Sequence, residues 1–372
     1  MGKRGDAKAR KELALAKERR RRVPTSGSEP GPEQYGIKLP PEPPPGGRPP
    51  RPDMSGVDWD ALRADYPEGA HGARRAMFIA NIADRTTRAI EFMPWGLNPN
   101  PVHPDSRFAR DDSAVTLDDE PNLVSSTALY PTMNASENLV AAAHVISFAI
   151  TKGQLRTSAT TALCRIAMES SAKTIWLISE TDTEERLRRC YGFVKGEHGR
   201  QAEFEKFSTE AFETRTDPLL DGDRAEFERA REGASARRAR IGDLPTSALQ
   251  APPKNVLTLV MESAQWMDEN VPRTPDPELD NVIHPRDPKS FYSLSSGFVH
   301  GFKWLTPYVN SMDDSGLLQI TLDALENALR MTECAVALYE AQAIGPRPDP
   351  RRRRNYPVGL AATVEELAPR YR

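Results

Sequence analysis

The chain has 372 residues, which allows one or two domains because domains commonly run to about 100–200 residues. Its hydrophobic fraction of 38% and mean hydropathy of −0.59 are low for a wholly folded chain, and its 33 prolines gather in particular stretches. Part of the chain is therefore predicted to be disordered, and the remainder reads as an ordinary globular sequence. The net charge of −3 hides an asymmetry, since the first 22 residues carry ten basic and three acidic side chains. The sequence thus combines a basic arm with an acidic body.

The three cysteines, Cys164, Cys190 and Cys334, are far apart and none belongs to a C-x-x-C pair. This spacing argues against a disulfide framework and a structural zinc site, and it favours a reducing compartment. Cys164 and Cys190 lie beside apolar residues on predicted helices and are interpreted as small core residues. The longest apolar run, Leu139–Ile150, is interrupted by a histidine and a serine. It falls short of the roughly 20 residues that span a bilayer. We expect a cytoplasmic protein that does not enter the membrane.

The first predicted segment is a disordered basic and proline-rich arm, residues 1–56. Residues 8–22 contain good helix formers but only two leucines to bury, which predicts at most a transient helix. Residues 23–56 are rich in proline, which fixes φ and lacks an amide donor, so an extended linker is predicted. The folded domain is expected to cover 57–345, and a mobile basic tail is expected over 346–372.

Helical periodicity dominates the folded domain, and no run alternates at period two. The fold class predicted is an all-α multi-helix bundle. Residues 94–133 lack a helical period and are interpreted as a long, partly ordered loop, while 182–241 reads as a protruding pair of charged helices. The expected helices are 71–93, 134–152, 155–179, 182–207, 223–241, 254–268, 289–305 and 316–343.

The common catalytic and metal-binding signatures are absent. The chain contains no G-x-G-x-x-G, G-x-x-x-x-G-K-[ST], G-x-S-x-G or H-E-x-x-H, and no two of its six histidines lie four apart on one helix. We therefore predict neither a metal site nor a cofactor.

Arg165 and Glu169 form the first polar pair that the pattern singles out. They are four residues apart and share a helical face with Ala172 and Trp176, so the ion pair would sit among apolar neighbours. Such a pair could orient a phosphate or a catalytic water. It could equally bridge this helix to a neighbouring one, and structural ion pairs are much the commoner kind.

The segment 291–305 carries aromatic residues on both sides of the predicted helix 289–305. Tyr292, Ser296 and His300 fall on one ridge and are expected in a semi-buried polar environment. His300 could serve there as an acid or base, or it could simply donate a hydrogen bond to an adjacent helix.

Two motifs carry a family resemblance, R-x-x-x-E-S-S-A-x-x-x-W-L in 165–177 and Y-x-L-S-x-x-x-x-H in 292–300. The matching residues are Arg165, Glu169, Ser170, Trp176, Leu177, Tyr292, Leu294, Ser295 and His300. Together they resemble uncharacterised helical proteins of bacteria and phages, which look like distant members of the HEPN-like group found in toxin–antitoxin and abortive-infection systems. The resemblance covers roughly 135–340. Active HEPN ribonucleases carry an arginine and a histidine with four to six residues between them, whereas the nearest pair here, Arg189 and His198, has eight intervening residues. The resemblance thus implies a bundle without that nuclease site.

The basic arm is the third candidate feature. Arg19, Arg20, Arg21 and Arg22 could neutralise nucleic-acid phosphates without sequence specificity, or they could form a solubilising tail. The run Arg351–Arg354 has the same two interpretations.

The function predicted from these features is a non-catalytic interaction or regulatory protein of a bacterium or phage, with an unknown protein partner. The alternative is an RNA- or nucleotide-acting enzyme of HEPN-like type. Its catalytic residues would be Arg165, Glu169, Tyr292 and His300, in a polar pocket between helices 155–179 and 289–305.

Overall fold

A computed structural model describes residues 67–117, 121–153, 157–272, 283, 286–305, 314–347, 352 and 355–371. These described residues form helices, turns and connecting segments with no strand, which confirms the all-α prediction. The chain divides into two units, Met1–Ala73 and Arg74–Arg372, so the boundary falls within helix α3 (Pro67–Ile90). The predicted arm, 1–56, lies outside the described residues.

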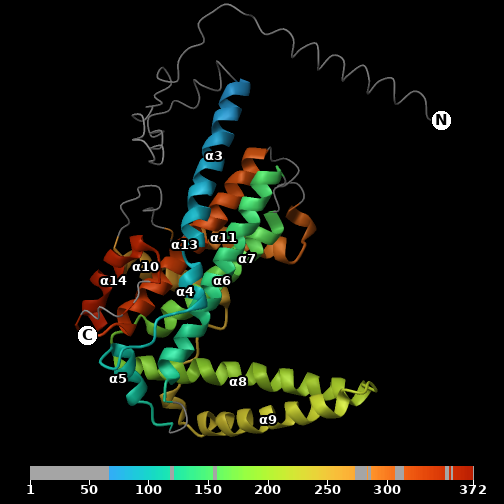
Figure 1. Cartoon of the computed structure of the whole chain (residues 1–372), viewed down its shortest axis with the longest axis vertical. Coiled ribbons are helices and arrows are strands. Elements are labelled where there is room, and N and C mark those ends of the chain that lie inside the picture. Colours follow the sequence, from blue (N-terminus) through green and yellow to red (C-terminus); the bar gives the residue numbers. More distant parts are fainter. Residues whose placement is uncertain are drawn as a thin grey trace, which may run out of the picture. The chain divides into compact units, whose positions relative to one another are not determined.

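Three long helices make up the centre of the second unit: α6 (Leu123–Lys152), α7 (Thr157–Ile178) and α13 (Asp314–Ala343) (Figure 1). Their buried hydroxyl groups pair across the interfaces. Thr132 Oγ1 lies 2.9 Å from Thr174 Oγ1, and Ser171 Oγ lies 3.2 Å from Thr332 Oγ1. Because these polar groups satisfy one another, they can be buried without a large desolvation cost.

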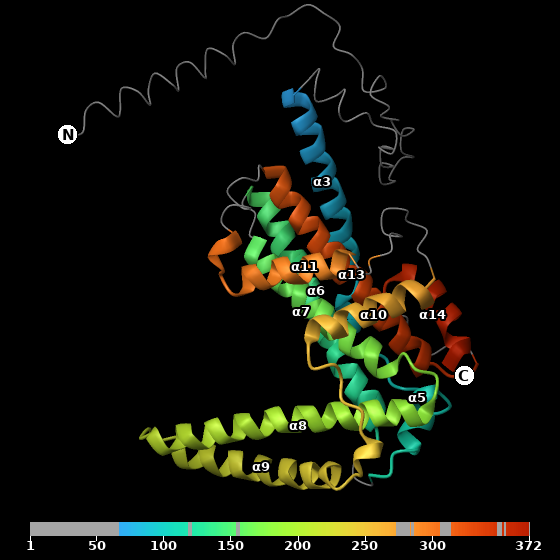
Figure 2. The same ribbon diagram turned by 180° about the vertical axis from the view of Figure 1, so that it is seen from behind.

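Shorter helices surround this centre. α10 and α11 pack against α7, α4 packs against α6, and α5 packs against both α6 and α13. Figure 2 shows α10 and α11 crossing the bundle on the face turned away in Figure 1. At the C-terminal end, α14 and the 3₁₀ turn η5 pack against α13. The bounds are α4 (Met93–Leu97), α5 (Arg107–Ser113), α10 (Val256–Asn270), α11 (Arg286–Val299), η3 (Lys303–Leu305), η4 (Val358–Leu360), α14 (Ala361–Leu367) and η5 (Ala368–Tyr371).

The prediction of a long loop over 94–133 is wrong, because this stretch contains α4, α5 and the first turns of α6. Pro94 lies in the first turn of α4, where its missing N–H is not needed. Pro131 lies inside α6 and is buried there. The start of α6 is capped from a distance, since Asp112 Oδ1 accepts hydrogen bonds from the backbone N–H groups of Val124 and Ser125 at 2.8 and 3.1 Å.

The prediction of a mobile basic tail over 346–372 is also wrong for its described residues. Arg352 donates to the buried carboxylate of Glu340 at 2.8 Å, and Trp95 donates to the other oxygen of that carboxylate at 2.8 Å. Tyr371 is 1% exposed, and its hydroxyl donates to the carbonyl of Ser179 at 2.9 Å. The carboxylate of Glu340 and the carbonyl of Ser179 therefore bind the described part of the tail. The basic composition of the tail does not reveal these partners.

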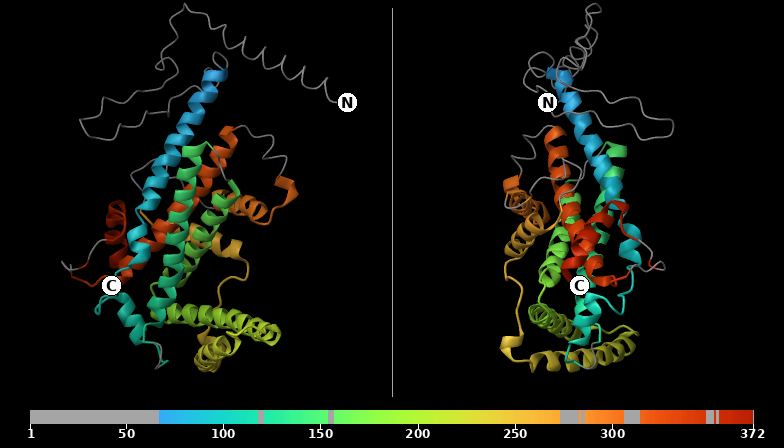
Figure 3. Two further views of the ribbon diagram at one scale, coloured as in Figure 1. Left: turned by 45° about the vertical axis from the view of Figure 1, so that its right-hand side comes forward. Right: turned by 90° about the vertical axis from the view of Figure 1, so that its left-hand side faces the viewer.

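The predicted charged pair corresponds to two long antiparallel helices, α8 (Thr183–Thr214) and α9 (Leu220–Gly242), which lie side by side in both views of Figure 3. The buried residues of α8 fall between Arg186 and Val194, with Glu205 as the exception. Glu205 accepts two hydrogen bonds from Arg238 of α9, at 2.7 and 2.6 Å. Beyond Val194, α8 is thus supported mainly by α9.

None of the described helices combines the length and the apolar character that crossing a membrane requires.

Candidate functional site

Three of the four residues predicted for a catalytic pocket come together between α7 and α11. Arg165 Nε donates to Glu169 Oε1 at 2.7 Å, and Arg165 Nη2 donates to the hydroxyl of Tyr292 at 2.8 Å. The guanidinium carbon lies 4.3 Å from the centroid of the Tyr292 ring, within the range of a cation–π contact. The cluster therefore links the two helices through one arginine.

The electrostatics of this cluster keep Arg165 charged and Tyr292 neutral at neutral pH. Partial burial lowers the pKa of Arg165, but the hydrogen bond and charge of Glu169 outweigh it, so that the pKa is raised. Burial and the charge of Glu169 raise the pKa of Tyr292. A tyrosine with a raised pKa is a poor general base, and an arginine with a raised pKa is a poor proton donor. The arrangement suits a helix-to-helix bridge, which is one of the two interpretations that the sequence left open.

His300 does not join the cluster. The prediction of a helix through Leu305 is wrong, because α11 ends at Val299 and Gly301 adopts a left-handed φ of 62°. His300 is exposed, and its ring stacks on Phe302 with centroids 5.4 Å apart. A glycine just after a periodic segment is a common helix terminator, and Gly301 was the sequence signal for this end.

The sequence also singled out two basic runs. The first lies outside the described residues and consists of Arg19, Arg20, Arg21 and Arg22. Within Arg351–Arg354 only Arg352 is described, and it is bound to Glu340.

All three cysteines are buried, and burial raises the pKa of each thiol to about 12. This result confirms the prediction that Cys164 and Cys190 fill the core, and it adds Cys334 to them. Among the described residues, no group of three or more metal-ligating side chains could hold a metal ion.

The sequence did not reveal a buried ion pair at the base of the hairpin. Asp111 of α5 and Arg186 of α8 are both fully buried, and Arg186 Nη2 lies 2.6 Å from Asp111 Oδ2. Thr183 donates to Asp111 Oδ1 at 3.0 Å, and the guanidinium of Arg186 lies 5.7 and 5.9 Å from the ring centroids of Phe108 and Tyr371. Burial lowers the pKa of Arg186 to about 10, which still leaves it charged at neutral pH. The sequence missed this pair because Asp111 fell in the predicted loop.

The outer part of the hairpin carries exposed aromatic residues. Phe204 and Phe207 are 65% and 63% exposed, and they lie three residues apart on α8, with the exposed Ala211 four residues further on. This three-then-four spacing forms one helical stripe of the kind that packs against another helix. The stripe is distinct from the α8 face that contacts α9, where Phe212 meets Phe227 with ring centroids 5.3 Å apart.

Charge is divided along the same hairpin. Near the base, residues 195–202 and 233–242 hold five basic and one acidic side chain. Towards the tip, residues 203–232 hold ten acidic and five basic side chains. The exposed Phe204 and Phe207 thus lie close to the boundary between a positive and a negative half.

Comparison of the chain with protein-family models, with curated proteins and with solved structures found no match. The resemblance to the HEPN-like group stays a prediction.

Proposed function

We propose that this protein is a non-catalytic interaction protein that associates with a second copy of itself through the α8–α9 hairpin. One observation carries the proposal: two exposed phenylalanines, Phe204 and Phe207, lie midway along a hairpin whose two halves carry opposite charge. Solvent-exposed aromatic rings on a long, otherwise charged helix favour an interface.

A twofold axis through the middle of the hairpin would pair the exposed phenylalanines of two copies and would also bring their oppositely charged halves together. The part of α8 that extends from the bundle begins at Lys195, and the turn after α8 lies near Asp217, so the midpoint falls close to Lys206. Two hairpins that pair antiparallel about this point bring Phe204 and Phe207 of both copies together. The acidic tip of each copy then lies against the basic base of the other. Such an isologous contact is closed, and it limits assembly to two copies.

The catalytic alternative has weaker support. Its acid–base residue, His300, is exposed and stacked on Phe302, while Arg165, Glu169 and Tyr292 are engaged with one another. The non-catalytic proposal agrees with the HEPN-like resemblance, which implies a bundle without the nuclease motif. We also propose that the protein has a regulatory role in a bacterium or phage. Arg19–Arg22 would bind nucleic acid without sequence specificity.

Charge reversal tests the proposed pairing. About the axis near Lys206, Arg200 of one copy approaches Glu213 of the other. Arg200→Glu introduces two repulsive contacts in a twofold dimer and is expected to raise the dissociation constant about tenfold at low salt. The double variant Arg200→Glu/Glu213→Arg restores opposite charges and is expected to recover most of that loss. Sedimentation equilibrium of the full chain measures both constants.

Glu262→Gln, on the exposed surface of α10, is the control variant and should leave the dissociation constant of the dimer unchanged. A wild-type chain that remains monomeric at about 100 μM, well above the dissociation constants of stable interfaces, would contradict the proposal.

A further inference from the structure

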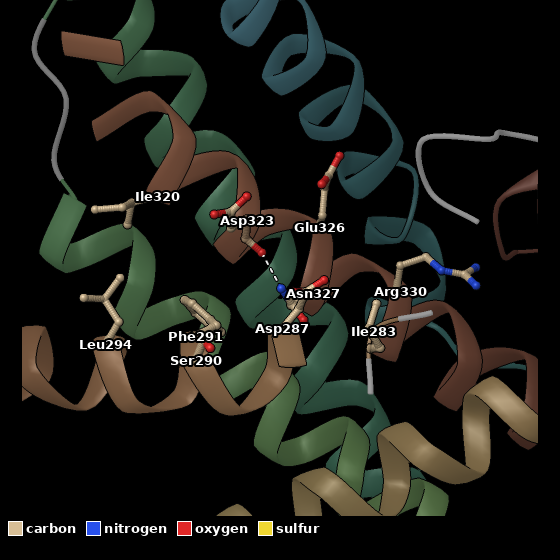
Figure 4. A pocket seen from close by; sticks show the side chains of 10 residues that line it. All are labelled: Ile283, Asp287, Ser290, Phe291, Leu294, Ile320, Asp323, Glu326, Asn327 and Arg330. Atoms are coloured by element: carbon tan, nitrogen blue, oxygen red, sulfur yellow. Dashed lines mark hydrogen bonds between the residues drawn. The ribbon is translucent and has the colours of Figure 1, made fainter. Parts of the chain in front are cut away.

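A polar cavity lies between α11 and α13, away from the hairpin. Its volume is about 220 Å³, which is below the roughly 300–1,000 Å³ typical of pockets for drug-sized ligands. Figure 4 shows its side chains gathered between the two helices. The polar members are Asp287, Ser290, Asp323, Glu326 and Asn327, and the apolar members include Ile283, Phe291, Leu294 and Ile320.

Asn327 is the unusual member of this lining. Its side chain is only 4% exposed, and its Nδ2 donates to the backbone carbonyl of Asp323 at 2.8 Å. Its Oδ1 is buried and accepts no hydrogen bond from the described residues. Because a buried acceptor without a hydrogen bond destabilises the fold, this atom marks a place where a bound donor would be favourable.

Two carboxylates add negative charge beside this acceptor. Asp287 and Asp323 both line the cavity and remain exposed to solvent. Partial burial raises the pKa of Asp323, and the charge of Asp287 raises it further. A cation between the two carboxylates would relieve this repulsion.

Two arginines whose side chains the structure describes lie near this pair, and both are directed elsewhere. Arg85 is engaged with Glu326, at 3.1 Å from Nε to Oε1, and with Asp84 at 2.9 Å. Arg330 lines the cavity with its stem, but Figure 4 shows its guanidinium turned away from Asp287 and Asp323. Gln319 donates a neutral hydrogen bond to Asp323 at 2.6 Å, which leaves the charge of Asp323 in place.

We infer that this cavity binds a primary alkylammonium group, with the ammonium between Asp287, Asp323 and Asn327 Oδ1 and the alkyl chain against Phe291, Leu294 and Ile320. An ammonium carries three N–H donors, which matches two carboxylates and one amide oxygen. The apolar wall favours an organic cation over a metal ion, in keeping with the lack of a metal-ligating cluster among the described residues. The same chemistry is available from a free small amine or from a lysine side chain of a polypeptide.

Isothermal titration calorimetry of the full-length protein tests this inference. The probes are n-butylamine, the neutral analogue n-butanol and Nα-acetyl-lysine N-methylamide, which presents a lysine side chain in a peptide-like setting. We expect one n-butylamine per chain and binding of n-butanol weaker by about tenfold or more, since the alcohol lacks the charge. Tighter binding of the lysine derivative than of n-butylamine would identify a polypeptide as the source of the ammonium.

Two variants assign the site. Asp323→Asn removes one charge at nearly constant shape, and Asn327→Leu removes the acceptor; each should weaken n-butylamine binding by about tenfold. Glu262→Gln, a charge removal on the surface of α10, should have no effect. Thermal unfolding of each variant confirms that it is folded before titration. Absence of n-butylamine binding, equal affinity for n-butanol, or unchanged affinity in Asp323→Asn would each overturn the inference.

Discussion

Truncation of the two exposed phenylalanines should separate the proposed dimer. Phe204 and Phe207 are 65% and 63% exposed, so about two thirds of each side chain is available for burial. Full burial of a phenylalanine contributes roughly 1.5–3 kcal/mol, which scales to about 1–2 kcal/mol for each of these rings. A twofold interface buries four such rings. Because alanine keeps its Cβ and area converts incompletely to affinity, we expect Phe204→Ala/Phe207→Ala to cost about 3–6 kcal/mol of association energy.

That loss raises the dissociation constant by roughly two to four orders of magnitude, at about 1.4 kcal/mol for each factor of ten. Sedimentation equilibrium over a range of concentrations measures the change. Phe148→Ala is the matched control, since Phe148 is 57% exposed but lies on α6. If the double variant dimerises as tightly as the wild type, or if Phe148→Ala weakens the dimer equally, the hairpin is not the interface.

Four further outcomes follow from the described contacts. Asp111→Asn leaves the buried charge of Arg186 without its partner and should lower the free energy of unfolding by about 3–5 kcal/mol in urea titrations; a loss below about 1 kcal/mol would mean that the pair is not formed. Burial raises the pKa of Glu333 above its ordinary 4.5, so the ionised form is disfavoured in the folded state. The free energy of unfolding of the wild type, relative to Glu333→Gln, should therefore rise as the pH falls from 7 towards 4.5 and level off below it, whereas a decrease would reverse the assigned shift. Tyr292→Phe removes the hydroxyl bound to Arg165 and should cost about 1–2 kcal/mol of unfolding free energy without changing the oligomeric state, and an unchanged urea midpoint would show that this hydrogen bond contributes little. Deletion of Met1–Arg22 should abolish retention of the protein on RNA or DNA at low salt while leaving its melting temperature unchanged, and retention by the truncated chain would place the binding elsewhere.

Much of the helical framework could be predicted because its signals are local. The stripe of Leu318, Leu325 and Leu329 along α13 is buried in the structure, as its spacing indicates. The pair Arg165 and Glu169 was also identified from spacing alone, since residues four apart on a helix are neighbours. Tyr292 of α11 was predicted to share a pocket with this pair, but spacing along one helix could not show that its hydroxyl accepts a hydrogen bond from Arg165.

The elements that were missed depend on contacts between distant segments. The first turn of α6 is capped by Asp112, and the C-terminal segment is held by Glu340 and Ser179. Asp112 and Glu340 lie 12 residues from the groups that they bind, which is beyond the reach of one helical turn, and Ser179 lies 192 residues from Tyr371. The cavity that contains Asn327 is of the same kind, because only the packing of α11 on α13 brings Asp287 near Asp323. Tertiary contacts overrode local propensity in each case.

The buried ion pair at the base of the hairpin connects stability to the proposed assembly. Apart from Glu205, α8 has no buried residue beyond Val194, so the short stretch from Arg186 to Val194 must hold the direction of the whole hairpin. An apolar contact alone would resist separation but would allow the helix to rotate, because dispersion contacts have little directional preference. The guanidinium of Arg186 is held by more than packing, because it is paired with Asp111 at 2.6 Å, donates to the carbonyl of Glu180 at 3.3 Å and lies near the rings of Phe108 and Tyr371. A hairpin fixed in this way presents Phe204 and Phe207 in one orientation, which lowers the entropy cost of pairing with a second copy.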